Sequence, residues 1–531
     1  MPEPSSSERR AKGCLVAAFL WLVILGLLAV GYRYLVHPRL SDRLARETGA
    51  ASQYQDEITV AADSFSGYAV LRSEMVRADL KARKIKLSIT DDRANYSGRI
   101  QALREGKIQM AVFTIDSLVT ASAKLGEFPG TIVLVIDETK GGDALVANTN
   151  VVKSLEDLNT ADARFVLTPN SPSEFFARVV LAQFQLNGAA SKWLEPADGA
   201  AAVLEAARRR GSSERKAYVL WEPYVSRALE LPGMSVLIDS SKLRGYVLDV
   251  LVARREFLRD RPELVQAVVE AHQRAAYAYS QRPEGWIKLV QEDARQTGAD
   301  RLDESQARKV VQGIQWKNTV ENYAHFGLTT GIDAGGIPNL EDSVGNILNV
   351  LVKTRALDAD PLPGRHNTLF SDKPLSAMRS AQFHPGRGLN LVDDPSLTNV
   401  ASEQVRGEKE LGVLSQEQWE RLRPVGQLQL EPISFGRASP TLTLDGERAL
   451  SELVRRFESF PRYYLRVIGQ ARSEGDPEAN RQLAQARADA VLQFLSGNGL
   501  SRGRMRAEVS ATRVTGGEAQ SVAFVVGEVP Y

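Results

Sequence analysis

The residues best placed to bind a solute are small hydroxyls at a predicted helix start. The stretch 164–188, RFVLTPNSPSEFFARVVLAQFQLNG, begins as a strand and turns into a helix at Ser171-Pro172-Ser173-Glu174. Serine before proline, with glutamate three positions after the serine, is typical of a capping box. Because the first amides of a helix lack intrahelical acceptors, this start predicts an anion or carboxylate site. A helix start with solvated amides fits the same letters equally well.

Patterns typical of catalysis or metal binding are missing from the sequence. The chain has no Gly-x-Ser-x-Gly, no phosphate loop and no dinucleotide fingerprint. The five histidines are scattered without metal-ligand spacing: His37, His272, His325, His366 and His384. We therefore expect no enzyme activity, no cofactor and no metal site.

Alternating strands and helices must position any binding residues. Short β-branched runs at 57–62, 84–89, 108–113 and 131–137 predict strands, and helical stretches lie between the first of them. This alternation is typical of a mostly parallel sheet covered by helices. The alternation of strands and helices continues through 216–258, after which the sequence predicts helices to about residue 352.

A second, smaller unit is predicted in the last hundred residues. Prolines and polar residues between 351 and 424 predict a linker, with a reach of about 40–50 Å if it is flexible. The unit at 425–531 opens with the strand PISF and continues in the order β-α-β-α-β-β. Its first helix places Leu450, Leu453, Val454 and Phe457 on one face.

The N-terminus predicts a membrane anchor. Residues 13–36 begin with twenty uncharged residues, close to the ~20 that a helix needs to span a bilayer. No small-x-small cleavage site follows, so we expect an uncleaved signal anchor between a tail at 1–12 and a stalk at 37–55.

Composition narrows the class of partner. At roughly 150 residues per domain, 531 residues predict two to four domains. Lys+Arg is 66 against Asp+Glu 65, a net charge of +1, so no global field attracts nucleic acid. The single cysteine, Cys14, excludes an intrachain disulfide.

The unit at 425–531 resembles the OmpA-like C-terminal domain, a peptidoglycan-binding module of bacterial envelopes. The stretches ISFGRASPTLTLDGERALSELV, VIGQARSEGDPEANRQLAQARADAVLQFL and GLSRGRMRAEVSA carry the resemblance. It implies that Asn480 and Arg487 keep their family places in a peptidoglycan site, where the arginine meets the diaminopimelate carboxylate. Arg472 stands where the family has an aspartate that meets the diaminopimelate ammonium. Wall binding and a fold without its ligand both remain open.

The unit at 56–350 resembles two-lobed periplasmic solute-binding proteins of type 2, closest to the nitrate/sulfonate/taurine branch of ABC-transporter components. The resemblance rests on 99–126, 154–188, 217–229 and 255–271, in that order. It implies a ligand between two lobes, at strand ends and helix starts. Carried onto this chain, the expected ligand-binding residues are Ser64, Phe65, Ser66, Gly67, Tyr68, Thr114, Ile115, Asp116, Asn170, Ser171, Ser173, Trp221 and Glu222.

Together these features predict an α/β protein: a transmembrane helix, a two-lobed domain and an OmpA-like domain. We expect a single-pass protein of the cytoplasmic (inner) membrane, with most of the chain in the periplasm, that captures an anionic or carboxylate-bearing solute. A permease, an envelope complex and peptidoglycan are the expected partners besides the solute; nucleic acid is not one. The alternatives are a structural or signalling component with a ligand-free cleft, and an enzyme of the pyrimidine-precursor type.

Overall fold

The computed structural model describes residues 53–529 with internal gaps. The gaps are 185, 187, 189–191, 212, 299–300, 330–335, 388–402, 407–410 and 511–521. The chain divides into two compact units, Met1–Ile58 with Arg77–Ser88 and Thr59–Val76 with Ile89–Tyr531. In the first unit the amides of Gln55 and Asp56 both donate to the Lys84 carbonyl, at 2.7 and 3.3 Å. This pairs the chain around the starts of β1 (Asp56–Ala62) and β2 (Ile85–Asp91).

The larger sheet of the second unit runs in the order β11-β4-β10-β3-β1. β1 pairs in parallel with β3 (Met110–Thr114), while β10 (Leu248–Arg254) lies antiparallel between β3 and β4 (Gly130–Thr139). β11 (Ile314–Trp316) closes the other side of β4. All residues of β3 and β4 are buried, which explains the largely apolar sequence of both strands.

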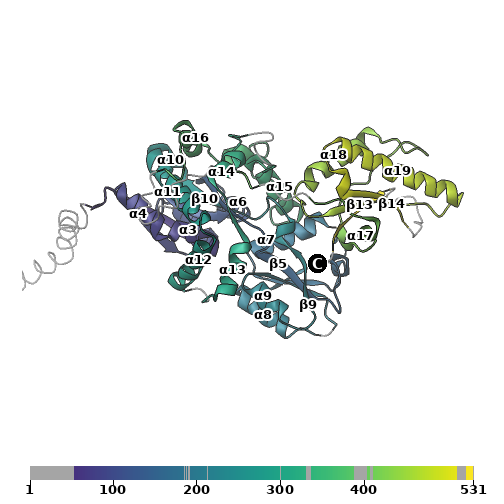
Figure 1. The fold of residues 1–531 in the computed structure, drawn as a ribbon, viewed down its shortest axis with the longest axis horizontal. Helices are drawn as coiled ribbons and strands as arrows, with labels where there is room; N and C mark the ends of the chain where they lie inside the picture. The colour runs from purple at the N-terminus through teal and green to yellow at the C-terminus, as the bar shows by residue number, and fades with distance from the viewer. Residues whose placement is uncertain are drawn as a thin grey trace, which may run out of the picture. The chain divides into compact units, whose positions relative to one another are not determined.

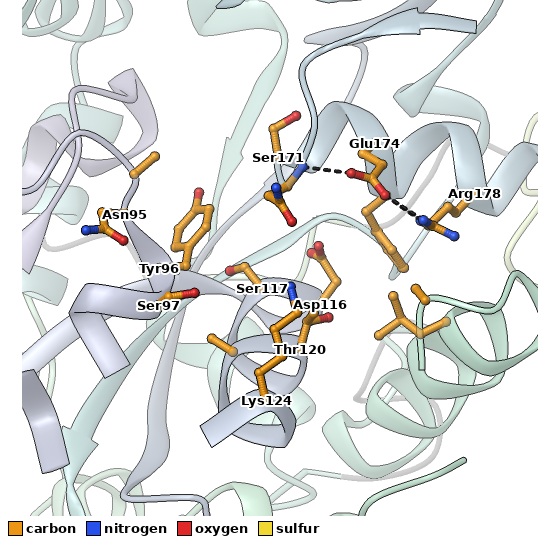
Figure 2. Close-up of a pocket in the computed structure, with 16 residues that line it drawn as sticks. Asn95, Tyr96, Ser97, Asp116, Ser117, Thr120, Lys124, Ser171, Glu174 and Arg178 are labelled. Carbon is orange, nitrogen blue, oxygen red and sulfur yellow. Dashed lines mark hydrogen bonds and ion pairs between the residues drawn. The ribbon is translucent and has the colours of Figure 1, made fainter. Parts of the chain in front are cut away.

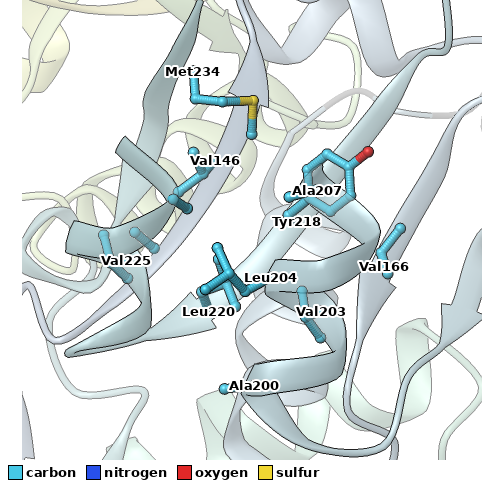
Figure 3. Packing of buried hydrophobic residues seen from close by; sticks show 12 residues of the cluster. Val146, Val166, Ala200, Val203, Leu204, Ala207, Tyr218, Leu220, Val225 and Met234 are labelled. Atoms are coloured by element: carbon cyan, nitrogen blue, oxygen red, sulfur yellow. The ribbon is translucent and has the colours of Figure 1, made fainter. Parts of the chain in front are cut away.

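The smaller sheet has the order β7-β6-β8-β5-β9. Its strands are β5 (Asp143–Asn148), β6 (Arg164–Leu167), β7 (Leu194–Pro196), β8 (Lys216–Trp221) and β9 (Met234–Asp239). Helices α8 (Gly199–Arg208) and α9 (Tyr224–Leu229) cover one face of it (Figure 1). Val203 and Leu204 of α8 meet Tyr218 and Leu220 of β8 in a buried cluster (Figure 3). The apolar stripe of α8 thus becomes the core of this lobe.

The chain crosses between the two sheets twice. β4 leads into β5 through Gly141, whose φ of +97° favours glycine, and β9 leads back to β10 through η5 (Ser240–Lys242). The Ser240 hydroxyl accepts the amides of Gly141 and Asp143 at 2.8 and 3.2 Å. These bonds tie the two crossings together. The resulting architecture is mixed α/β, as predicted, and contains two separate sheets before the C-terminal domain.

Helices cover the sheets and fill the region after β10. Besides α8, α9 and η5, those before β10 are η3 (Ser66–Tyr68), α3 (Ala69–Arg72), α4 (Glu74–Ala82), α5 (Tyr96–Arg104), α6 (Ile115–Leu125), η4 (Leu155–Leu158) and α7 (Pro172–Gln183). Those after it are α10 (Arg255–Asp260), α11 (Pro262–Ser280), α12 (Pro283–Thr297), α13 (Glu304–Gln312), α14 (Thr319–His325) and α15 (Leu340–Lys353). The helical prediction to about residue 352 thus agrees with the structure, apart from the short strand β11.

Part of the segment predicted as a linker is folded. It contains η7 (His366–Leu369) and α16 (Lys373–Ser380), and Phe370 forms a parallel bridge with Ile132 of β4. The side chains of Leu369, Leu375 and Met378 are 0% exposed. A flexible chain of 40–50 Å reach does not describe this part of 351–424, because its apolar side chains pack into the core.

The C-terminal domain contains a four-stranded sheet in the order β12-β15-β13-β14. Its elements are α17 (Gln416–Glu420), β12 (Arg423–Gln427), α18 (Leu444–Phe457), β13 (Tyr464–Gly469), α19 (Pro477–Gly497), η9 (Arg502–Arg504), β14 (Met505–Val509) and β15 (Val522–Glu528). The order from β12 onward is the predicted β-α-β-α-β-β. The prediction of PISF as the opening strand is wrong: only Phe435 forms a bridge, to Leu442, and β12 takes the strand position.

The predicted tail, anchor and nearly all of the stalk, together with Cys14, lie outside the described residues. Within the part of the chain that the structure describes, no helix is both long and apolar enough to span a bilayer.

Candidate functional site

A pocket of about 310 Å³ is lined by residues of α5, α6, α7 and the turn before α7 (Figure 2). Leu351 and Ala356, in and after α15, complete its wall. Its polar side chains are Asn95, Tyr96, Ser97, Asp116, Ser117, Thr120, Lys124, Asn170, Ser171, Glu174 and Arg178. Helix starts that follow strands of both sheets meet here, which is where two-lobed α/β proteins place ligands.

Asp116 is the buried acid of this pocket. The buried strand β3 ends at Thr114, and α6 begins at once, so Asp116 lies in the first helical turn. Its side chain is 6% exposed, and its Oδ1 has no hydrogen-bond partner among the described residues. Burial raises the pKa of Asp116 to about 7, opposed by hydrogen bonds from Thr114 and nearby amides and reinforced by the charge of Glu174.

The start of α7 forms the opposite wall. Ser171 is the N-cap and Pro172 the first helical residue, as predicted, but the capping box is wrong. The Ser171 hydroxyl donates to the Thr168 carbonyl at 2.6 Å, and Glu174 accepts the amide of Asn170 at 2.7 Å. The left-handed φ of +54° at Asn170 presents that amide to Glu174, which explains the exchange of partners.

Arg178 and Ser173 add to the chemistry of α7. Arg178 binds Glu174 with nitrogen–oxygen distances of 2.6 and 2.9 Å and also donates to the Thr354 carbonyl. The Ser173 side chain is 1% exposed, and its hydroxyl has no partner within the described part of the chain. The Arg178 guanidinium therefore binds mainly Glu174. The buried Ser173 hydroxyl, at the helix start, is left without a hydrogen-bond partner among the described residues.

Sequence reasoning missed the residues contributed by α5 and by the later turns of α6 and α7. Asn95 caps α5 by accepting the Gly98 amide at 3.0 Å, and Tyr96 follows it. The pKa of the Tyr96 phenol is raised, first by burial and then by the charge of Asp63. The sequence could have predicted the start of α5 after β2, because Asn95 is a residue type that often caps helices. The four-residue spacing of Glu174 and Arg178 was a readable helix pair.

The loop predicted from Ser64 to Tyr68 does not line this pocket. Tyr68 is 1% exposed, and its hydroxyl donates to the Asp249 carboxylate. The Gly67 carbonyl accepts the indole N–H of Trp316 at 2.8 Å. Phe65 packs edge-to-face on Tyr68 with ring centroids 5.3 Å apart. Ser64 is exposed, and Ser66 begins η3.

Other predicted residues also lie away from the pocket wall. Thr114 and Ile115 are buried behind Asp116. Glu222 accepts the amide and the hydroxyl of Ser226, at 3.2 and 2.9 Å, so it caps α9 locally. Trp221 is half-buried and packs against the core of the smaller sheet. Of the predicted set, Asp116, Asn170 and Ser171 line the pocket; the ligand role of every member remains a prediction.

A second group of acids lies on the strands of the larger sheet. Asp137 of β4 and Asp249 of β10 are register partners and are 0% and 1% exposed. Both Asp137 oxygens lack a conventional partner among the described residues. Burial raises the pKa of each carboxyl, and the attraction of Lys317 only partly offsets this at Asp137. The pair therefore retains a proton at neutral pH.

The predicted peptidoglycan residues lie before and within α19: Arg472 precedes the helix, Asn480 is in its first turn and Arg487 is near its middle. Asn480 donates to the carbonyls of Glu474 and Arg472, at 2.6 and 3.2 Å. Arg487 donates to the Ser439 carbonyl at 3.0 Å, with its guanidinium 5.0 Å from the centre of the Phe435 ring. Burial lowers the pKa of Arg487, and the charge of Arg472 lowers it further. The exposed Arg472 thus adds a cation beside Arg487, where the resemblance implies an anion.

Solved structures share a likeness with the larger part of the chain. The aliphatic sulphonate binding protein SsuA from Escherichia coli is 17% identical, with TM-score 0.43, and covers 59% of this chain and 98% of its own. A putative sulfonate-binding SsuA from Methylobacillus flagellatus KT is 14% identical, with TM-score 0.47, covering 62% and 96%. The desulfurization enzyme DSZB is 12% identical, with TM-score 0.42, covering 62% and 100%.

The C-terminal domain has sequence relatives. Peptidoglycan-associated lipoproteins of Brucella melitensis biotype 1 and Brucella suis biovar 1 are 32% identical over 74 residues, 14% of this chain. The match covers 44% of those lipoproteins, so the chain spans less than half the length of the curated relatives it matches. Residues 434–521 match the model of the OmpA family, which identifies this segment as an OmpA domain.

Proposed function

We propose that this protein is a solute-binding protein anchored in the inner membrane, with its two-lobed and OmpA domains in the periplasm. The pocket beside Asp116 holds a small carboxylate-bearing solute, and the OmpA domain contacts peptidoglycan. A membrane permease or an envelope complex receives the solute or the signal of its binding. The observation that carries the proposal is the polar pocket where the starts of α5, α6 and α7 meet.

Several features of the pocket support an acidic group of the solute at α7. The first amides of that helix have no intrahelical acceptor, and its dipole favours negative charge. Lys124 of α6 adds a cation on the pocket wall, and the buried Ser173 hydroxyl lies in the first turn of α7. A volume of about 310 Å³ is at the lower end of the range usual for small-molecule sites.

Native mass spectrometry of the full chain in detergent tests the binding function. The full chain is required because Phe370, beyond the two-lobed domain predicted from the sequence, bridges to β4. We expect a co-purified small mass, or a thermal shift with an added solute, that Ser171→Ala with Ser173→Ala weakens. Ser213→Ala, at an exposed residue of the loop before β8, is the matched control. An empty protein that no solute stabilises would instead favour an envelope scaffold with a ligand-free cleft.

Membrane topology is tested independently by protease accessibility in spheroplasts. The uncharged stretch at 13–36 supports one crossing, which would leave every described residue open to protease from the periplasmic side. Protection of the described domains in intact spheroplasts, with cleavage only after lysis, would overturn the proposed orientation.

A further inference from the structure

We propose that the solute of this pocket carries a protonated amine, which donates to Oδ1 of Asp116. The solute is then a zwitterion, with its amine at the start of α6 and its acidic group at the start of α7. The inference rests on the proposed function and names the ligand class of the same pocket.

Asp116 has an unused acceptor in a buried place. Its side chain lines the pocket at 6% exposure, and Oδ1 lacks a partner among the described residues. A buried carboxylate oxygen without a donor costs free energy, and a charge-assisted N–H donor removes that cost. A single available oxygen suits an ammonium better than a divalent cation. No cluster of three or more acidic, histidine or cysteine groups suitable for a metal occurs in the described residues.

The charges around Asp116 favour a cation at this position. Glu174 of α7 acts on it as a negative charge, and Asp116 itself raises the pKa values of Asp143 in β5, Asp249 in β10 and Tyr96 in α5. Several neighbouring elements therefore present acids or a phenol, and α15 contributes Leu351 without charge.

The cations near the pocket do not neutralise its Asp116 end. Arg178 binds Glu174, and Arg99 binds Asp92 and, at 3.1 Å, Asp63. Lys124 lies at the last turn of α6, whereas Asp116 lies in the first turn. Figure 2 shows Lys124 and Asp116 on the same helix, with Ser171 across the pocket. The arrangement offers an acidic end at Asp116 and donors at α7, which are complementary to the two ends of a zwitterion.

Matched solutes separate the amine from the acid. The full chain in detergent is titrated calorimetrically with 4-aminobutyrate, 4-hydroxybutyrate and butylamine, and with the corresponding sets two to five carbons long. We expect the amino acid of the best length to bind at least tenfold more tightly than its hydroxy and amine counterparts. Asp116→Asn should remove that preference, while Asp162→Asn, an exposed change on the smaller lobe, should leave it intact.

The other outcomes are decisive in different ways. Equal binding of the amino and hydroxy acids, or an Asp116→Asn variant that keeps full affinity, would overturn the amine and leave a carboxylate receptor. Full affinity in Asp116→Asn would mean that Asp116 acts as a neutral hydrogen-bond donor. Binding of none of the solutes, together with no co-purified mass, would overturn the proposed function and this inference together. Circular dichroism of each variant separates lost binding from lost folding.

Discussion

The proposed solute pocket and the OmpA domain show opposite departures from charge balance. At the pocket, Asp116 is a buried acid with an unused oxygen, while at α19 the exposed Arg472 adds a second cation beside Arg487. The first charge is removed from water, so its protonation changes near neutral pH. The second remains exposed to solvent. Burial therefore makes the pocket sensitive to pH, whereas the proposed wall site should respond to the sign of the side chain at position 472.

Reversing the charge at Arg472 should have the largest effect. Arg472→Asp replaces repulsion of an ammonium with attraction, a change of about 2 kcal/mol at the effective dielectric of a protein surface. We expect roughly a 30-fold gain in sedimentation with purified peptidoglycan. Arg481→Asp, an equal charge change at an exposed site on α19, is the control. If both variants bind like the parent protein, the α19 site does not hold the wall peptide.

The pH dependence of solute binding should sharpen the comparison. The pKa of Asp116 is about 7 in the free protein, so the carboxylate that accepts an ammonium is mostly absent at pH 6 and mostly present at pH 8. Affinity for an amino acid should rise about tenfold over this interval. Burial and, to a smaller extent, the charge of Glu174 hold the pKa of Asp116 near neutrality. Asp116 in turn raises the pKa values of Asp143, Asp249 and Tyr96.

Isothermal titration calorimetry at three pH values measures how the affinity for the solute changes with pH. A carboxylate solute bound by a protonated Asp116 would show the opposite slope, with affinity falling as pH rises. The affinity of the Arg472→Asp variant for peptidoglycan should not change between pH 6 and pH 8, because arginine and aspartate do not titrate in that range.

The buried acid pair should have a smaller effect, on folding. Burial raises the folded-state pKa of Asp137 and Asp249 above the ordinary value of about 3.9. The unfolded chain therefore binds fewer protons above about pH 4, and stability falls as pH rises toward the raised pKa. Asp137→Asn should remove this loss. Relative to the parent protein, the variant should gain about 1 kcal/mol more free energy of unfolding at pH 8 than at pH 5.

Urea unfolding at the two pH values checks that prediction. Asp445→Asn, at an exposed residue in the first turn of α18, should change the free energy by less than about 0.5 kcal/mol at either pH. A loss of stability in Asp137→Asn that is equal at pH 5 and pH 8 would mean that the pair contributes geometry rather than a titrating charge.

The sequence predicted local features better than long-range ones. The helix start at Ser171 and Pro172 follows from residue types alone, and the structure has it. The partner of Glu174 was missed because it depends on the backbone angle of Asn170, which no propensity fixes. The pairing of Asp137 with Asp249 was unpredictable because the intervening chain builds the whole smaller sheet. The folded part of 351–424 was missed because its prolines and polar residues outnumber the few leucines that anchor it.

The position of β10 has a consequence for how the protein is made. The larger sheet cannot close until β10 inserts between β3 and β4, and the chain from Asp143 to Asp239 must be synthesised first. Until then the facing edges of β3 and β4 are unpaired and prone to join another chain. Such a long-range pairing also slows folding. We therefore expect the smaller lobe to fold while the larger lobe is still incomplete, and a chain stopped before residue 248 to require a chaperone.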